Sequence, residues 1–213
     1  MQIVDVIDNW QHRCWLGFRW RARTSVTYKV LFAVGMACVT GVLAQLRIHL
    51  PFTPVPITGQ VLGVLLSGVL LGGNFGALSQ VFYAGFGLAG IPWFAGSTMG
   101  ASVLLGPSGG YILGFIPAAY FLGRITDRYV SSRRLVPQIA LMLVAVGVIY
   151  LCGAIQFVML MHTGFADTMH MATLPFIPVD IFKAFLAAGI STALLPRLPY
   201  NGEIDSSKSI TPQ

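Results

Sequence analysis

Continuous apolar runs dominate the hydropathy pattern of this 213-residue chain. Six runs are apolar enough to cross a lipid bilayer, namely 26–46, 57–73, 75–91, 107–123, 135–161 and 177–195. Most lie near the roughly 20 residues that a helix needs to cross a hydrocarbon core. Continuous runs favour helices over a transmembrane barrel, whose strands alternate over about ten residues. The pattern therefore predicts an all-α membrane protein, built as a bundle of six transmembrane helices.

The composition supports a lipid environment. Only 9% of the residues are charged and the mean hydropathy is +0.75, whereas soluble domains carry about 25% charged residues. Eleven of the 13 basic residues fall before or at the start of the first run, between the fourth and fifth, or after the sixth. The positive-inside rule places these three regions, and hence both termini, in the cytoplasm. The same asymmetry explains the net charge of +6 without a nucleic-acid partner.

Three segments follow from this pattern: a basic N-terminal arm (1–25), a transmembrane domain (26–199) and a polar cytoplasmic tail (200–213), solvated from about residue 201. In the arm, apolar residues recur at helical spacing (Ile3, Ile7, Trp10, Cys14 and Phe18). This spacing predicts an interfacial helix along the inner leaflet. A disordered basic arm is the alternative.

The connection between the first two runs is rich in proline. Pro51, Pro54 and Pro56 interrupt 50–58, which excludes a regular helix because each proline removes a donor and restricts its predecessor. Irregular apolar backbone at membrane depth must pack over protein or a cavity. We therefore expect an extended or re-entrant loop that covers a pocket, and similar behaviour from the Gly-rich and aromatic connection 91–110.

Asp180 and Lys183 lie one helical turn apart at the start of the last run. A charge inside a membrane helix costs roughly 2.5 to 3.5 kcal/mol even on mild insertion scales, so such residues usually pair, face a cavity and mark a site. Residues at i and i+3 project from one helical face. A binding site is favoured over a structural ion pair that reaches to the outer interface.

An embedded acyltransferase or hydrolase would need a nucleophile with a base and an orienting group, and none is evident. Gly106-Pro-Ser-Gly-Gly lacks the lysine of a phosphate-binding loop. His162, Asp167 and His170 match no defined metal site. We therefore expect neither an enzyme nor a metal protein.

An ordered set of motifs resembles the BioY family, the biotin-binding S components of energy-coupling factor (ECF) vitamin transporters. The motifs are Val55-Pro-Ile-Thr-Gly-Gln60, Ser67-Gly-Val-Leu-Leu-Gly-Gly73, Gly85-Phe-Gly-Leu-Ala-Gly-Ile-Pro-Trp-Phe94, Leu105-Gly-Pro-Ser-Gly-Gly-Tyr-Ile-Leu-Gly-Phe115 and Asp180-x-x-Lys183. The resemblance covers about residues 28–195. It differs at Gly59, at Trp93 and in the polar stretch 97–99.

The resemblance implies a six-helix protein of the cell membrane that captures biotin from outside and works with a transmembrane T component and a pair of ATPases. It implies no cofactor of the chain's own, because ATP would be bound only by the partner ATPases. It also implies docking on the T component through small residues of the first helix, which Ala33, Ala37 and Gly41 match; small residues four apart let helices approach closely. Internal packing is the alternative for these three residues.

Biotin needs an acceptor for its ureido N–H groups, an apolar cradle and a cation for its carboxylate. Asp180 and Lys183 supply an acceptor and a cation, although the sequence does not show which end of biotin each one meets. Gln60 is the next candidate, with an interhelical or capping hydrogen bond as its alternative role. Tyr83, Trp93, Phe94 and Tyr111 are candidate walls, although such aromatic residues also serve as packing or interfacial residues.

A self-sufficient, ion-coupled secondary transporter for a small anionic nutrient is the alternative function. Such proteins typically show internal repeats and broken helices at mid-membrane. No repeat relates 26–91 to 107–195, and the charged pair lies near one end of its run, so the resemblance remains the favoured interpretation.

Overall fold

The computed structural model describes residues 3–162 and 164–205. Each of the six apolar runs coincides largely with a helix: α2 (Val26–Ala44), α3 (Gln60–Leu71), α4 (Gly73–Leu88), α6 (Gly109–Arg128), α7 (Leu135–Met161) and α9 (Ile177–Leu194). They are accompanied by α1 (Ile3–Arg23), α5 (Ala101–Leu104), α8 (Phe165–Ala172) and the 3-10 turn η1 (Ser131–Arg133). Two short strands, β1 (Arg47–Ile48) and β2 (Ile57–Thr58), form an antiparallel ribbon. The all-helical prediction is confirmed.

Length and composition mark fewer membrane spans than the sequence predicted. Among the described residues, α2, α7 and α9 are long and apolar enough to cross a membrane, and α3 is a shorter apolar helix of 12 residues. Gly72, at φ 80°, separates α3 from α4. The C-terminal part of α6 carries Arg124, Asp127 and Arg128, which lowers the hydropathy of that helix.

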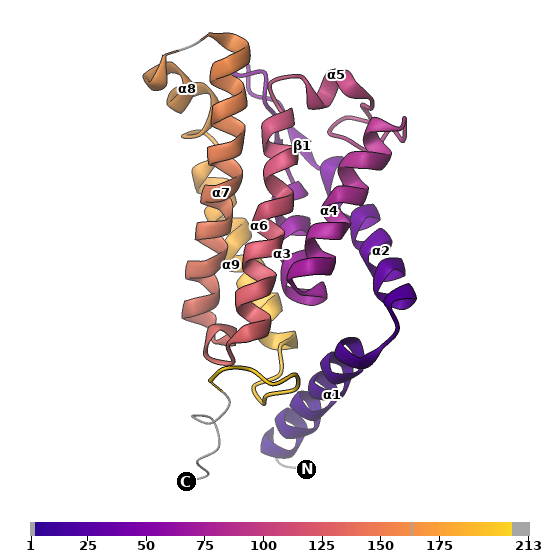
Figure 1. The fold of residues 1–213 in the computed structure, drawn as a ribbon. Coiled ribbons are helices and arrows are strands. Elements are labelled where there is room, and N and C mark those ends of the chain that lie inside the picture. The colour runs from indigo at the N-terminus through magenta and orange to yellow at the C-terminus, as the bar shows by residue number, and fades with distance from the viewer. Residues whose placement is uncertain (1–2, 163, 206–213) are drawn as a thin grey trace.

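Helix α6 occupies the centre of the bundle and packs against α3, α4 and α7 (Figure 1). The α3–α6 contact is close because α3 presents Gly68 to the backbone of Ala119, and a Cβ at residue 68 would lie 2.8 Å from the Ala119 carbonyl oxygen. Leu65, Leu122 and Ile149 fill the space between these helices. A core this dense fixes the helix positions that surround the site.

Small residues on α2 pack inside the chain. Ala33 and Ala37 are fully buried, and the Trp93 ring would lie 3.1 Å from a Cβ at Gly41. Helix α2 contacts α3 and α4 on this side, while its opposite face exposes Leu31, Val39 and Val42, among others. The prediction that Ala33, Ala37 and Gly41 form a docking surface is therefore corrected to internal packing. The face of α2 that carries these small residues packs against other parts of the same chain.

The helix predicted in the N-terminal arm is confirmed, and α1 packs against the end of α9 and the segment that follows it (Figure 1). Trp10 Nε1 donates to the Ala193 carbonyl at 2.9 Å, and Trp15 Nε1 donates to the Pro199 carbonyl at 2.9 Å. These bonds hold the beginning and the end of the described chain at the same end of the bundle.

Within the predicted solvated tail, Asn201, Gly202 and Ile204 are exposed as expected, but Glu203 is not, and 206–213 lie outside the described residues. Glu203 is buried and accepts a hydrogen bond from Arg133 Nη2 at 2.5 Å. Burial raises the pKa of the Glu203 carboxyl, but hydrogen bonds from Arg133 and from the backbone N–H groups of Tyr200 and Asn201 outweigh burial and hold this pKa below its usual range. The tail therefore folds back because a buried arginine needs a partner.

Candidate ligand-binding site

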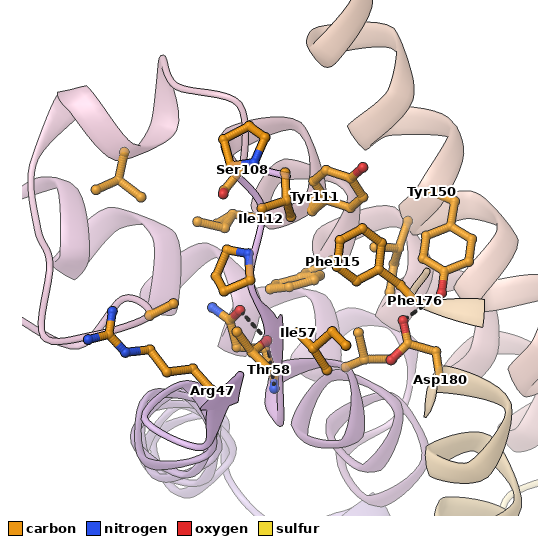
Figure 2. Close-up of a pocket in the computed structure, with 18 of the residues that line it drawn as sticks. Arg47, Ile57, Thr58, Ser108, Tyr111, Ile112, Phe115, Tyr150, Phe176 and Asp180 are labelled. Atoms are coloured by element: carbon orange, nitrogen blue, oxygen red, sulfur yellow. Dashed lines mark hydrogen bonds between the residues drawn. The ribbon is translucent and has the colours of Figure 1, made fainter. Parts of the chain in front are cut away.

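The β-ribbon lies at the end of the bundle away from α1 (Figure 1). It lines a cavity of about 230 Å³ (Figure 2). A space of this kind suits a small metabolite rather than a macromolecule. Its lining comes from the β-ribbon and proline loop, the connection 91–108, the N-terminal ends of α3, α6 and α9, and the middle of α7. It includes Arg47, Pro54, Val55, Pro56, Thr58, Gln60, Ala95, Thr98, Ser108, Tyr111, Ile112, Phe115, Ile149, Tyr150, Phe176, Asp180 and Lys183.

The proline-rich loop covers this cavity as expected. The antiparallel ribbon pairs Arg47 with Thr58 and closes the loop between them, and Val55 at the loop centre is buried. Residues 54–56 form part of the cavity wall. The connection 91–110 contributes the facing rim, where Gly96 and Ser97 adopt positive φ angles of 76° and 57°.

Asp180 and Lys183 form an ion pair on the cavity wall. Lys183 Nζ lies 2.6 Å from Asp180 Oδ1, and their side chains are 12% and 6% exposed, respectively. Helix α9 begins at Ile177 with a proline in its first turn, where a carboxylate is favoured by the positive end of the helix dipole. The predicted common face is confirmed, and the pair faces the cavity rather than an outer interface.

Two further groups fix this pair. The Tyr150 hydroxyl of α7 donates to Asp180 Oδ2 at 2.7 Å, and Lys183 Nζ donates to the Thr58 carbonyl oxygen of β2 at 2.5 Å. Each Asp180 oxygen thus holds one donor and keeps room for another, because a carboxylate has about four acceptor positions. The site can therefore present a fixed acceptor and a fixed donor to a ligand.

Gln60 both lines the cavity and makes hydrogen bonds within the protein, which are the two roles that the sequence left open for it. Its side chain lines the cavity, and its amide donates to the Tyr83 hydroxyl at 2.5 Å while accepting from the Thr58 hydroxyl at 2.7 Å. One N–H and one acceptor position of the amide remain for a ligand.

Only one of the four predicted aromatic walls lines the cavity. Tyr111 does so, and its hydroxyl donates to the Ala172 carbonyl oxygen. Tyr83 and Phe94 are fully buried, and Trp93 Nε1 donates to the Tyr83 carbonyl oxygen at 2.9 Å. Tyr83, Trp93 and Phe94 are therefore corrected from walls to packing behind the wall, since their rings contact one another.

Sequence reasoning missed Tyr150, Phe176 and the Thr58 carbonyl group. Tyr150 lies within the continuous apolar run 135–161, and nothing in that run marks this tyrosine as a site residue. A backbone carbonyl group is common to every residue, so the sequence cannot indicate which one lines a site. Arg47 could have been singled out from the sequence, because it is a basic residue on the side opposite to the three regions in which most basic residues gather. Figure 2 shows it across the cavity from Asp180.

Sequence reasoning also missed one candidate nucleophile, Ser108, which is the central residue of a Gly-x-Ser-x-Gly spacing of the kind that marks a nucleophile in hydrolases. Here the spacing follows the short helix α5 and a turn rather than a strand. In 3–162 and 164–205 no hydrogen bond joins the Ser108 hydroxyl to a histidine, and no cluster of metal ligands occurs.

The chain is similar to known proteins over most of its length. The BioY family model matches residues 18–200. The chain belongs to the BioY family. The relatives include a probable biotin transporter BioY of Methanothermobacter thermautotrophicus, 43% identical over 68% of this chain and 96% of the relative. Another is a biotin transporter BioY of Rhizobium etli, 30% identical over 80% and 94% of the two chains.

One solved structure extends this likeness to the BioY fold. The S component for biotin from an ECF-type ABC transporter matches with a TM-score of 0.74 and 26% identity, over 80% of this chain and 94% of that chain. Membership of the BioY family confirms the family resemblance and the expectation of a transport component rather than an enzyme.

Proposed function

We propose that this BioY protein captures biotin and serves as the S component of an ATP-driven ECF-type vitamin transporter. The observation that supports this proposal most directly is the covered cavity in which Asp180 and Lys183 form an ion pair at 2.6 Å beside Tyr150. Relatives named biotin transporters and the structural match to a biotin S component support the ligand.

The cavity offers each kind of contact that biotin requires. Asp180 is an acceptor for ureido N–H groups, and Gln60 and Lys183 add donors. Ile112, Phe115 and other apolar side chains suit the thioether ring and the valerate chain. A mostly apolar wall with a few fixed polar groups is the usual design of a small-molecule site.

The proposed topology has six membrane-crossing helices in the cell membrane, with both termini in the cytoplasm. It is supported by the six helices in the predicted runs and by the position of α1 and 196–205 at one end of the bundle. Arginines of α1, of the α6–α7 connection and of the tail gather at that end, as the positive-inside rule requires. The cavity then opens to the outside.

Transport energy must come from partners under this proposal. The chain contains no lysine-bearing phosphate-binding loop, so a T component and a pair of ATPases would supply ATP hydrolysis. Because α2 turns Ala33 and Ala37 inward, the exposed residues of its opposite face, Leu31, Val39 and Val42, are the surface that a T component would meet.

Uptake of labelled biotin tests the proposal. Cells that express the chain with a T component and ATPases should accumulate biotin, and cells in which the ATPases carry an inactivating substitution should not. Collapse of the proton and sodium gradients should leave ATP-dependent uptake intact. Gradient-dependent uptake without the ATPases would instead identify a secondary transporter.

A further inference from the structure

Helix α1 has two faces, and only the inner one packs against the tail. On the inner face Trp15 Nε1 donates to the Pro199 carbonyl oxygen at 2.9 Å. The outer face is made of exposed residues at helical spacing, namely Asn9, Arg13, Leu16, Trp20 and Arg23. Among the described residues, a Cβ at Gly17 on this side would meet no neighbouring atom within 4 Å. Most of α1 precedes residue 18, where the family match begins, so family membership assigns this outer face no role.

The outer face carries positive charge that the protein does not neutralise. Within 3–162 and 164–205, the side chains of Arg13 and Arg23 make no hydrogen bond, ion pair or ring contact. Arg21, by contrast, is turned inward and pairs with Asp127 at 2.5 Å. The sequence has no acidic residue between Asp8 and Asp127, so α2, α3 and α4 have no carboxylate to offer. The uncompensated charge predicts a negatively charged partner.

Apolar side chains accompany these arginines. Trp20 is 51% exposed, and its ring centroid lies 5.9 Å from that of Phe32, in an edge-to-face arrangement, and 6.4 Å from that of Tyr28. Both partners lie on the exposed side of α2, which is long and apolar enough to cross a membrane. Figure 1 shows α1 outside the bundle, with its C-terminal end beside the start of α2. The outer face of α1 thus continues into the exposed side of α2 at a belt of aromatic residues, as is typical of a membrane interface.

We propose that the outer face of α1 binds anionic phospholipids of the cytoplasmic leaflet. Arg13 and Arg23 contact the phosphate groups, because a guanidinium matches phosphate with parallel hydrogen bonds. Leu16 and Trp20 lie between the two arginines along the helix and enter the apolar edge of the leaflet. The choice of leaflet rests on the proposed topology. Lipid fits this face better than a protein does, since the face continues into a helix side suited to lipid.

Quenching of tryptophan fluorescence by brominated lipid tests the proposal on the full chain. The protein is reconstituted in vesicles with equal amounts of phosphatidylglycerol and phosphatidylcholine, of which one or the other is brominated. Brominated phosphatidylglycerol should quench more strongly, as expected for at least about fivefold enrichment of anionic lipid beside α1. Trp20→Phe should remove most of this difference. High salt should reduce it, because exposed charges are screened.

Charge variants assign the enrichment to the outer face of α1. Arg13→Gln/Arg23→Gln should bring the enrichment to within about twofold of none. Arg128→Gln/Arg134→Gln is the matched control, since it removes two exposed arginines at the other side of the same end, in the α6–α7 connection. This control should keep the wild-type difference in quenching. Thermal unfolding at the wild-type temperature will show that each variant is folded.

Equal quenching by the two lipids in the wild-type protein would overturn the proposal, and so would an unchanged difference in Arg13→Gln/Arg23→Gln. Loss of the difference in the control variant would also overturn it, because the enrichment would then follow the total charge of this end. Equal quenching together with loss of T-component copurification in Arg13→Gln/Arg23→Gln would assign the face to a protein partner instead. Both leaflets carry the same lipids and no biotin is used, so failure of the proposed topology or of biotin capture would leave this result unchanged.

Discussion

Removing one member of the Asp180–Lys183 pair should destabilise the fold, and removing both should cost much less than the two losses combined. We consider Lys183→Met, which keeps the apolar stem, and Asp180→Asn, which keeps the shape. With the nitrogen and oxygen atoms 2.6 Å apart and an effective dielectric constant of about 20, the attraction is about 6 kcal/mol. Desolvation offsets part of it, so each single loss should cost about 3 to 5 kcal/mol.

The double variant leaves no unpaired charge. We therefore expect a coupling energy of at least about 2 kcal/mol between the two sites. Denaturant unfolding in detergent micelles, followed by tryptophan fluorescence, gives the free energy of unfolding for each of the four proteins. Additive losses within about 0.5 kcal/mol would refute the reasoning, because they would show that the two side chains do not depend on one another in the folded state.

Three other perturbations test the surrounding structure. Tyr150→Phe removes one donor to Asp180 and should weaken biotin binding about tenfold in calorimetry; unchanged affinity would contradict this role. Gly68→Ala should lower stability by about 1 to 3 kcal/mol because its methyl group meets backbone, whereas Gly147→Ala, with open space around it, should not, as thermal unfolding will show. Glu203→Gln should lower the melting temperature above about pH 4.5, and the difference should vanish as acid protonates the wild-type carboxylate, whose pKa is lowered in the folded state; a pH-independent difference would contradict the Arg133–Glu203 pairing.

Helix positions were predictable because continuous apolar runs leave few alternatives in lipid. The run 135–161 coincides with α7. The Asp180–Lys183 pair was predictable for a related reason, since two charges in an apolar helix need a partner and a cavity. Proline spacing likewise predicted an irregular loop, and the loop covers the cavity.

Side-chain direction was not predictable from the same patterns. The spacing of Ala33 and Ala37 indicates close helix contact but does not say whether the partner is another protein or the chain's own α4. Tyr83 and Tyr111 both lie near the site motifs, yet only Tyr111 lines the cavity. A polar tail gave no sign that Glu203 would pair with Arg133, because that contact joins residues 70 positions apart.

Tyr200 illustrates how the far end of the molecule is held. Its hydroxyl donates to Asp127 at 2.8 Å and accepts from Arg21 Nη2 at 2.8 Å. Burial raises the pKa of this hydroxyl, so it keeps its proton for Asp127. Arg21 also donates to the Leu70 carbonyl oxygen at 2.9 Å. The N-terminal helix, the end of α3 and the tail are thus joined by one polar cluster, far from the cavity.

Titration calorimetry of biotin against the wild-type protein and Lys183→Ala tests the central claim most directly. Lys29→Ala is the matched control, because Lys29 donates to the Ala22 carbonyl oxygen outside the cavity lining. We predict that Lys183→Ala binds biotin at least about tenfold more weakly, as expected for loss of a charge-assisted hydrogen bond, and that Lys29→Ala binds like the wild type. Wild-type affinity in Lys183→Ala would contradict the claim that this pair holds the ligand.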